Sequence, residues 1–497
     1  MFNQKCYIKS LPQSLNKLTL DLRSSKEYDK PCLLHILKRV RVLNQLDIIV
    51  RNNVSQLQPY LVSLQFACIK SLRLTLKHFS LFQEDSIREL WDILGRNLLQ
   101  NLSITIKYPS DMGGNNMISF FRNSISQFND KNFRVLSRKI SSLPKLKHLE
   151  LNFMSSHFIN LTKKSLIYMS NLMKNLHSLS SLHLNTSFKD VNYESLNQFS
   201  VVLSKKINLK SLQLHLKGFK NVSPEPLFNA ISKLGDLNAL SIENDCGWDE
   251  SNIQDFAASC ERLNNLKSFH FSYAPSEKMA YNPLFRTTLS KFTELRELSL
   301  ALSTIYEPEL FDLSHSLQYL VNLEKIEFCF LTENFSLKNM KRLSGSIASL
   351  EKLKDLSLKF AQCKFECGLL LMMADLFKSL KNIQEMTLYL LSSKETNQSN
   401  ERQGQFSLDI LNSLEDAKNL QKLDLKVDGT GIHFDNTESL VHFFKQHEKL
   451  RILKMGLLEL TLDDETKKTL ERFLQKEKPS DLTTFSLYNQ KETLFEF

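Results

Sequence analysis

A short motif, L-x-x-L-x-L, recurs along this chain of 497 residues and restricts its possible folds more than any other feature. Residues 208–216, NLKSLQLHL, show it clearly, because Leu209 is followed by leucines three, five and seven residues later. Apolar residues that alternate with polar ones predict a short strand with one buried face. About sixteen copies occur, so we predict a stack of one repeated unit. The first apolar residues of the copies are Leu15, Leu43, Ile69, Leu99, Leu146, Leu179, Leu209, Leu237, Leu266, Leu295, Leu323, Leu353, Ile383, Leu420, Leu450 and Leu482.

Most copies start 28–30 residues after the previous one, but two intervals are longer. The 47-residue interval contains a turn-rich segment at 108–117, followed by an expected helix from about Ile118 to Phe128. The 37-residue interval contains the segment 392–405, which has no apolar residue and is expected to be a surface loop. We therefore predict one repeat array over residues 1–497, with insertions at 107–135 and 391–407. The loop is either a tolerated insertion or a functional element.

The segments between the motifs have apolar residues at the three- and four-residue spacing of helices. In 223–234, Ser223 is the predicted N-cap and Pro224 the first helical residue. Asp249 is placed to cap a helix that begins at Glu250. The unit is therefore strand, turn, helix and return. The other predicted helices are 193–206, 368–377, 437–447 and 463–474.

This pattern resembles the leucine-rich repeat superfamily, in particular the long, helix-containing repeats typified by ribonuclease inhibitor. The resemblance covers essentially the whole chain. It implies an α/β fold, a curved horseshoe of about 16 repeats with a parallel sheet on the concave face and helices on the convex face. It also implies binding to another protein. One departure is clear: the family has Asn or Cys eight residues after the first leucine, where it forms a ladder, and this chain has neither residue at any of the sixteen positions.

Composition and motifs argue against several classes of protein. The chain is 42% hydrophobic and 24% charged, so it is globular rather than disordered. Its 12 glycines are few for a protein that cradles phosphates in loops. Motifs of nucleotide-binding loops, hydrolases, zinc proteases and kinases are absent from the sequence. We therefore predict a protein that is not an enzyme, with no cofactor and no small-molecule substrate.

The eight cysteines contain no C-x-x-C pair, and no zinc-binding set surrounds Cys363 and Cys367. Reduced thiols, no signal-like N-terminal segment and no apolar run of membrane-spanning length predict a cytoplasmic protein without a membrane partner. The most apolar run, 368–377, is expected to be a buried helix.

Residues two, four and six positions after each first leucine are predicted to point out of the sheet onto one open face. The expected positive side chains there are Lys17, Arg73, Lys325, Lys359, Lys422, Lys426 and Lys454. The expected negative ones are Asp21, Asp47, Glu150, Glu243, Glu297, Glu327, Asp355, Glu385 and Asp424. Seven cations against nine anions make the face close to neutral, so the formal charge of +10 must lie on helices and loops. A groove for nucleic acid on this face is disfavoured, because it would need a positive lining.

Histidines on the same face invite a metal interpretation, but His183, His215 and His270 come from separate repeats. A metal site needs three or four convergent ligands, so polar residues of a binding face are the better explanation. The predicted partner-binding residues on the concave face are His183, Ser211, Gln213, His215, Ser241, Glu243, His270, Glu297, Ser299, Glu327, Lys359, Tyr389, Lys426 and Tyr488.

The leading hypothesis is a non-enzymatic scaffold, adaptor or regulator that binds a partner protein through this concave face. The alternative is a binder of an anionic partner, nucleic acid or an acidic protein, through a basic convex surface. A third hypothesis is a GTPase-activating regulator, for which Arg23 or Arg51, just past predicted strands, would supply an arginine finger.

Overall fold

The structure is a computed structural model, and it divides into two compact units, Met1–Cys246 (unit 1) and Gly247–Phe497 (unit 2). Each unit is described by itself. The structure describes residues 14–22, 37–50, 63, 67–76, 99–106, 128–153, 159–217, 219, 222–275, 282–303, 305–331, 336–363, 367–392, 412–428, 437–457, 468, 471–472, 482–488 and 493–496.

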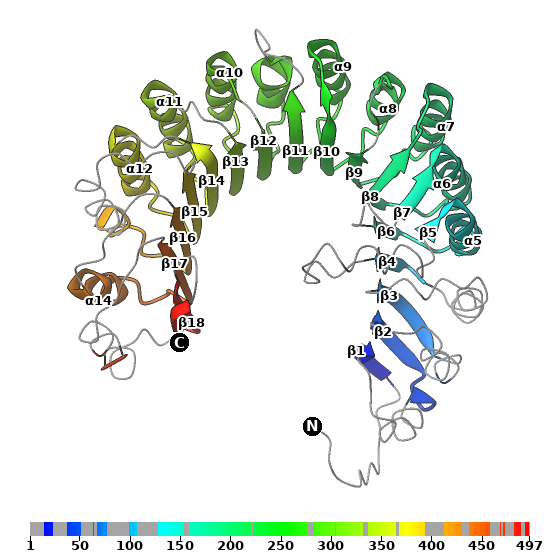
Figure 1. Cartoon of the computed structure of the whole chain (residues 1–497), viewed down its shortest axis with the longest axis horizontal. Helices are drawn as coiled ribbons and strands as arrows, with labels where there is room; N and C mark the ends of the chain where they lie inside the picture. The colour runs from blue at the N-terminus through cyan, green and yellow to red at the C-terminus, as the bar shows by residue number, and fades with distance from the viewer. Residues whose placement is uncertain are drawn as a thin grey trace, which may run out of the picture. The chain divides into compact units, whose positions relative to one another are not determined.

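Unit 1 is built on a parallel sheet in which each strand pairs with the next copy of the motif (Figure 1). The register holds the motifs level, so that Leu182 lies opposite Leu212 and Leu212 opposite Leu240. The strands are β1 (Ser14–Leu22), β2 (Val42–Val50), β3 (Cys68–Leu76), β4 (Asn101–Ile106), β6 (His148–Phe153), β8 (Ser181–Lys189), β9 (Ser211–Lys217) and β10 (Ala239–Trp248).

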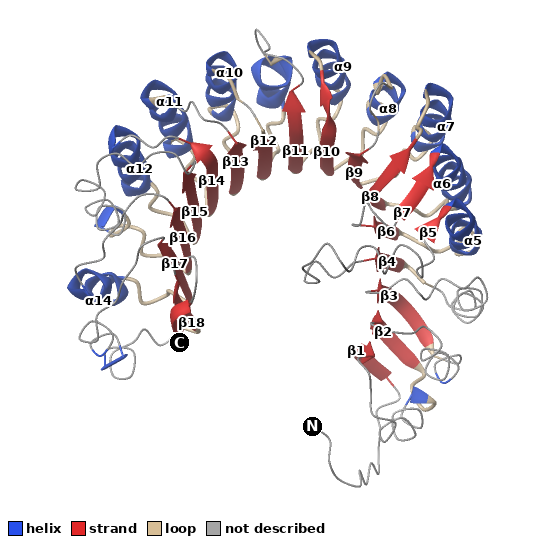
Figure 2. Cartoon of the chain, in the orientation of Figure 1, coloured by secondary structure: helices blue, strands red, loops and turns tan. Residues whose placement is uncertain are grey.

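Helices cover one side of this sheet and leave the other side open (Figure 2). The described helices of unit 1 are α5 (Asp130–Ile140), α6 (Lys163–Asn175), α7 (Tyr193–Leu203) and α8 (Glu225–Ile231). Two short strands, β5 (Phe128–Asn129) and β7 (Ile159–Thr162), add a second parallel pairing just before α5 and α6. The repeating unit is thus a strand followed by a returning helix, as predicted.

Unit 2 repeats the same plan, with a parallel sheet and helices on one side of it (Figure 2). Its parallel strands are β11 (Ser268–Pro275), β12 (Glu297–Leu302), β13 (Lys325–Leu331), β14 (Asp355–Cys363), β15 (Glu385–Ser392), β16 (Lys422–Asp428), β17 (Ile452–Leu457) and β18 (Thr484–Tyr488). Its described helical segments are α9 (Glu250–Cys260), η3 (Leu284–Thr288), η4 (Leu289–Lys291), α10 (Glu307–Leu317), α11 (Leu337–Ala348), α12 (Cys367–Ser379) and α14 (Thr437–Gln446).

Each of the sixteen motifs therefore corresponds to one parallel strand, and the prediction of an α/β repeat fold of solenoid-like type is confirmed at this level. The motif leucines form the core under the sheet: Leu295, Leu298, Leu300 and Leu302 are all buried. Residues between them are partly or fully exposed. This alternation is the period-two burial of a strand with one covered face.

Three residues before the first leucine of each motif lies a further position, which is buried wherever the structure describes it. The motif alone did not reveal this core position. In most repeats it is a buried apolar residue that closes the turn between helix and strand. Two polar side chains take this place, Lys206 and His447, and both are buried. The apolar examples are Leu143, Leu176, Leu234, Leu263, Phe292, Leu320, Leu350 and Leu380.

The predicted helices are mostly present, with shifted ends. Asp249 caps α9 as predicted, accepting a hydrogen bond from the Asn252 amide at 2.8 Å. The helix predicted to open at Pro224 begins one residue later, with Pro224 at the N-cap. The helix predicted over 193–206 ends at Leu203. Helix α12 contains the apolar run 368–377, and no described helix is long and apolar enough to cross a membrane.

The two predicted insertions fall largely outside the described residues, namely 107–127 and 393–407. Residues 128–135, the end of the first insertion, belong to β5 and the start of α5. Only residues 468 and 471–472 of the predicted helix 463–474 are described, and they are helical. Near the C-terminus, the short strand β19 (Thr493–Glu496) pairs antiparallel with β18 and sets Phe495 opposite Leu487.

One of the turns that lack the expected Asn or Cys contains a buried polar network instead. The Tyr273 hydroxyl at the end of β11 donates to Glu309 Oε1 at 2.9 Å. The side-chain amide of Asn282 donates to both residues, and Glu309 Oε2 accepts from the Tyr306 amide at 3.0 Å. One carboxylate therefore joins the strand end to the first turn of α10.

Candidate partner-binding face

The open face is the helix-free side of each sheet, formed by the side chains two, four and six positions after each first leucine. Because neighbouring motifs are level, side chains at the same offset form three straight rows across the strands. In unit 2, for example, His270 lies opposite Ser299, which lies opposite Glu327. Flat rows of this kind fix the relative positions of charges that are far apart in sequence.

In unit 1 the open face holds two histidine–carboxylate pairs. His183 Nδ1 on β8 lies 3.7 Å from Glu150 on β6, and His215 Nδ1 on β9 lies 3.2 Å from Glu243 on β10. The two histidines are not level, because His183 lies opposite Gln213 and His215 opposite Asn185. Each imidazole therefore faces a carboxylate on a different neighbouring strand.

Burial lowers the pKa of His183, although the charges of Glu150 and Glu243 act to raise it. At neutral pH its ring is thus mainly uncharged. Among the described residues, no group of three or more His, Cys, Asp and Glu side chains is placed to hold a metal ion. In unit 2, His270 Nδ1 instead makes a hydrogen bond of 2.7 Å with the Ser299 hydroxyl.

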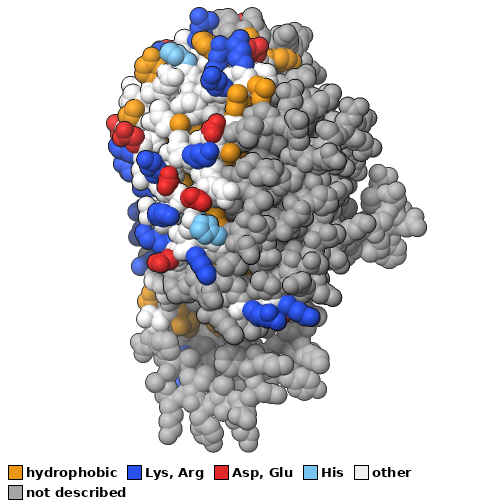
Figure 3. All heavy atoms as spheres, turned by 90° about the vertical axis from the view of Figure 1, so that its left-hand side faces the viewer, with side chains coloured by type: hydrophobic (Ala, Val, Ile, Leu, Met, Phe, Trp, Pro, Cys, Tyr) orange, Lys and Arg blue, Asp and Glu red, His pale blue; other side chains and the backbone are white. Residues whose placement is uncertain are grey.

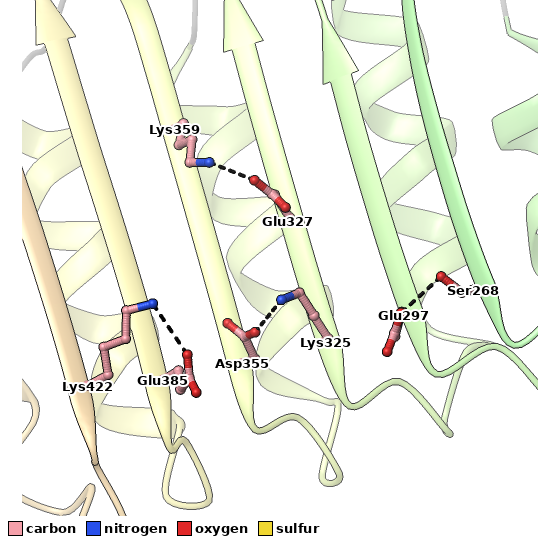
Figure 4. Close-up of polar contacts among 8 residues, drawn as sticks. All are labelled: Ser268, Glu297, Lys325, Glu327, Asp355, Lys359, Glu385 and Lys422. Atoms are coloured by element: carbon pink, nitrogen blue, oxygen red, sulfur yellow. Dashed lines mark hydrogen bonds and ion pairs between the residues drawn. The ribbon is translucent and has the colours of Figure 1, made fainter. Parts of the chain in front are cut away.

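In unit 2 the row of side chains two positions after each first leucine contains charge pairs between neighbouring strands (Figure 4). Lys325 Nζ lies 2.7 Å from Asp355, and Lys422 Nζ lies 3.4 Å from Glu385. Further along the same row, the Ser268 hydroxyl donates to Glu297 at 2.9 Å. The hydrogen bond from Lys325 to Asp355 raises the pKa of Lys325 against the opposing effect of burial.

A second cluster joins the two rows that lie four and six positions after the first leucines. Lys359 Nζ donates to Glu327 at 2.6 Å (Figure 4). The same Nζ lies 5.9 Å from the centre of the Tyr389 ring. The Tyr389 hydroxyl in turn donates to Asp424 at 3.2 Å. Burial acts to raise the pKa of Glu327, but the hydrogen bond from Lys359 and the nearby lysine charges outweigh it, so this pKa lies below its usual value. The carboxylate is therefore ionised and paired.

Thirteen of the fourteen predicted residues have described side chains, and these lie on the open face of the two units. Residues His183, Ser211, Gln213, His215, Ser241 and Glu243 lie on β8–β10 of unit 1. Those on unit 2 are His270, Glu297, Ser299, Glu327, Lys359, Tyr389, Lys426 and Tyr488. The Tyr488 side chain lies outside the described set, although its backbone is level with Gly456.

The predicted partner-binding set omitted several residues of the same face that form charge pairs there, namely Glu150, Lys325, Asp355, Glu385 and Lys422. Their signal in the sequence is an opposite charge at the same offset in consecutive repeats. Arg23 and Arg51, the predicted arginine-finger candidates, lie outside the described residues.

No protein-family model matches this chain, and no curated protein matches it in sequence.

Proposed function

We propose that this protein is a non-enzymatic scaffold, adaptor or regulator that binds a partner protein through the open face. The observation that supports this most is the mosaic of paired charges that the sheet holds in fixed rows. In unit 2 the described side chains of this face include five cations, Lys325, Lys359, Lys422, Lys426 and Lys454, and five anions, Glu297, Glu327, Asp355, Glu385 and Asp424.

A neutral mosaic favours a folded protein over a polyanion as the partner. It has no net charge to attract a string of phosphates, but it can match a surface of complementary pattern and exclude wrong partners by like-charge contacts. Tyr389 adds an aromatic side chain in the middle of the mosaic, partly exposed and already positioned by Lys359 and Asp424. Aromatic residues held in this way are common anchors of protein interfaces.

We further propose that the repeats are leucine-rich repeats of the long type, which would make the open face the concave side of each unit. The motif, the spacing, and the helices on the far side of the sheet support this assignment. The turn network of Tyr273, Asn282 and Glu309 would then be a local substitute for the Asn or Cys ladder.

The test is a charge-swap variant that alters the pattern of the face without breaking its pairs. The swap exchanges Lys325 with Asp355 (Lys325→Asp, Asp355→Lys) and Glu327 with Lys359 (Glu327→Lys, Lys359→Glu). The matched control exchanges the pair Glu307–Lys338, 3.1 Å apart on α10 and α11, in the same way. Both variants keep the net charge of the chain.

Tagged wild type and both variants would be used for quantitative affinity capture from the native cell. We expect at least one protein that the wild type and the helix-side control enrich equally and that the face variant loses by tenfold or more. If every captured protein is retained by the face variant, the open face is not the binding surface.

A further inference from the structure

The excess of positive over negative charge in this chain is confined to its N-terminal half. Residues 1–246 contain 33 Lys and Arg against 17 Asp and Glu, a formal charge of +16. Residues 247–497 contain 31 against 37, a formal charge of −6. Because unit 1 and unit 2 are built from the same repeat, the fold does not require this asymmetry. A charge excess restricted to one half is a common mark of binding to an anionic partner.

In unit 1 the excess collects along the edge where helices end and strands begin. We call this the basic edge and define it by ten side chains, all exposed. Asp236 is the one acidic side chain among the described turns of this edge, which span 37–41, 67–70, 141–147, 174–180, 204–210 and 232–238. The basic edge consists of Lys38, Arg39, Arg41, Lys70, Lys145, Lys147, Lys174, Lys205, Lys210 and Lys233.

Backbone hydrogen bonds between neighbouring strands set the order of the cations along the basic edge. The Gln100 amide donates to Lys70 O, and the Lys147 amide donates to Gln100 O, each at 2.8 Å. The same chain of bonds continues through Ser180 to Lys210. Lys70, Lys147 and Lys210 thus occupy every second strand, about 10 Å apart, since neighbouring strands are about 4.8 Å apart. From β2 to β10 the edge spans six strand intervals, or about 29 Å.

Among the residues that the structure describes, none of the ten cations of the basic edge forms an ion pair; the ion pairs described in unit 1 involve other residues. On the corresponding edge of unit 2, several cations instead pair with carboxylates between repeats. Lys291 lies 2.8 Å from Glu261, and Lys354 and Arg296 both face Glu324, at 2.6 and 3.6 Å. On the side of the molecule where α11, α12 and α14 lie, positive and negative side chains are likewise interspersed (Figure 3).

We propose that the basic edge of unit 1 binds the phosphate backbone of a nucleic acid. Eight of its ten cations are lysines, which make effective point-charge contacts with phosphate. None of its turns contains Phe, Tyr or Trp, the side chains that anchor proteins at membrane surfaces and stack on unpaired bases. A regularly spaced row of lysines therefore fits the regularly charged backbone of a duplex better than it fits a bilayer or a folded protein.

The geometry also predicts the character of this binding. The basic edge presents charges but no groups that reach base edges in a groove, so affinity depends on phosphate contacts and not on sequence. Each neutralised phosphate releases counterions, and the slope of log affinity against log salt steepens by about 0.9 per contact. An edge of about 29 Å covers about 9 base pairs at 3.4 Å each, which sets the minimal length of the duplex.

The probe is a fluorescently labelled, mixed-sequence DNA duplex of about 20 base pairs, more than twice the length covered by the edge. Binding to the full-length protein is followed by anisotropy between low and physiological salt. The edge variant is Lys70→Glu, Lys147→Glu and Lys210→Glu. The matched control in unit 2 is Lys267→Glu, Lys381→Glu and Arg451→Glu, three exposed side chains whose reversal changes the net charge equally. Circular dichroism confirms that both variants fold like the wild type.

We expect wild type and the unit 2 control to bind with the same steep salt dependence. The edge variant should bind at least tenfold more weakly at low salt, with a slope reduced by about 3, one for each phosphate contact removed. Equal weakening of both variants would overturn the proposal, since net charge and not the basic edge would then govern binding. So would a wild type that binds anionic lipid vesicles or an acidic polypeptide but not the duplex. These outcomes are independent of the charge-swap test of the open face.

Discussion

At the scale of single residues, Glu309 holds together a turn in which neither Asn nor Cys stands at the expected position. The carboxylate is almost fully buried, and burial raises its pKa despite three hydrogen bonds that favour the ionised form. It accepts from Tyr273, Asn282 and the Tyr306 amide, so it connects a strand end, a turn and a helix start. A buried group with this many partners is costly to remove, because its donors are left unsatisfied.

We therefore predict that Glu309→Ala lowers the free energy of unfolding by about 3 kcal/mol, and Tyr273→Phe by about 1–2 kcal/mol. The smaller loss follows because the hydrogen bond from Asn282 to Glu309 remains. Denaturant unfolding of the full chain measures both values. Losses below 0.5 kcal/mol in both variants would show that the network is not structural.

His447 occupies the buried position that is apolar in most repeats. Its two ring nitrogens face Phe443 O at 2.8 Å and Leu414 O at 3.0 Å. Burial lowers the pKa of His447, and this outweighs the two carbonyls, which favour the charged ring. The unfolded chain therefore binds a proton in a pH range in which the folded chain does not.

The pKa of His447 is lower in the folded chain than in the unfolded chain. Its contribution to stability is therefore fully present above pH about 6.5, and it is lost as the pH falls from that value through the folded pKa. The slope from one such group is at most about 1.4 kcal/mol per pH unit. We expect His447→Leu, which restores the side chain found at Leu320, to reduce the loss of stability between pH 7.5 and 5.5. An unchanged pH profile in urea unfolding would contradict this account.

At the scale of elements, side chains at helix starts connect neighbouring repeats. Asp130, at the start of α5, accepts hydrogen bonds from the amide and hydroxyl of Thr162, the N-cap of α6, and from the Ser165 hydroxyl. Asp249 accepts a hydrogen bond from the Asn252 amide within its own helix. Asp130 therefore joins two repeats, whereas Asp249 caps a single helix.

We predict that Asp130→Ala costs about 2–3 kcal/mol of stability and Asp249→Ala about 1 kcal/mol, the usual value of an N-cap. Denaturant unfolding and hydrogen exchange of the α6 amides check the difference. Equal losses in the two variants would mean that the contacts of Asp130 between repeats add nothing.

The elements also show how far sequence reasoning reaches. The motif predicted the strands and the side to which Ser211, Gln213 and His215 point, because a period of two residues leaves no other choice. It did not reveal the network at Glu309, because Tyr273 and Glu309 are 36 residues apart and meet only through the packing of two repeats. Nor did it reveal the buried Lys206, whose amine reaches Leu176 O at 2.9 Å across one repeat. Periodicity identifies a face, whereas specific contacts depend on individual side chains.

At the scale of the whole molecule, two units of the same construction carry different surfaces. The open face of unit 2 is a neutral mosaic, while unit 1 carries the basic edge. We expect the charge-swap variant of the open face to unfold within about 0.5 kcal/mol of wild type, because exposed ion pairs contribute 0–1 kcal/mol each and the swap preserves them. A larger loss in denaturant unfolding would mean that the mosaic serves the fold and not recognition.

The most direct test of the central claim is lysine acetylation footprinting of the protein alone and in complex with the partner recovered by affinity capture. If the open face binds that partner, Lys325, Lys359, Lys422 and Lys454 should lose at least fivefold in labelling rate on binding. Lys338 and Lys341, exposed on α11, should keep theirs. Protection of Lys338 and Lys341 with unchanged labelling of the four face lysines would contradict the account and place the partner on the helices.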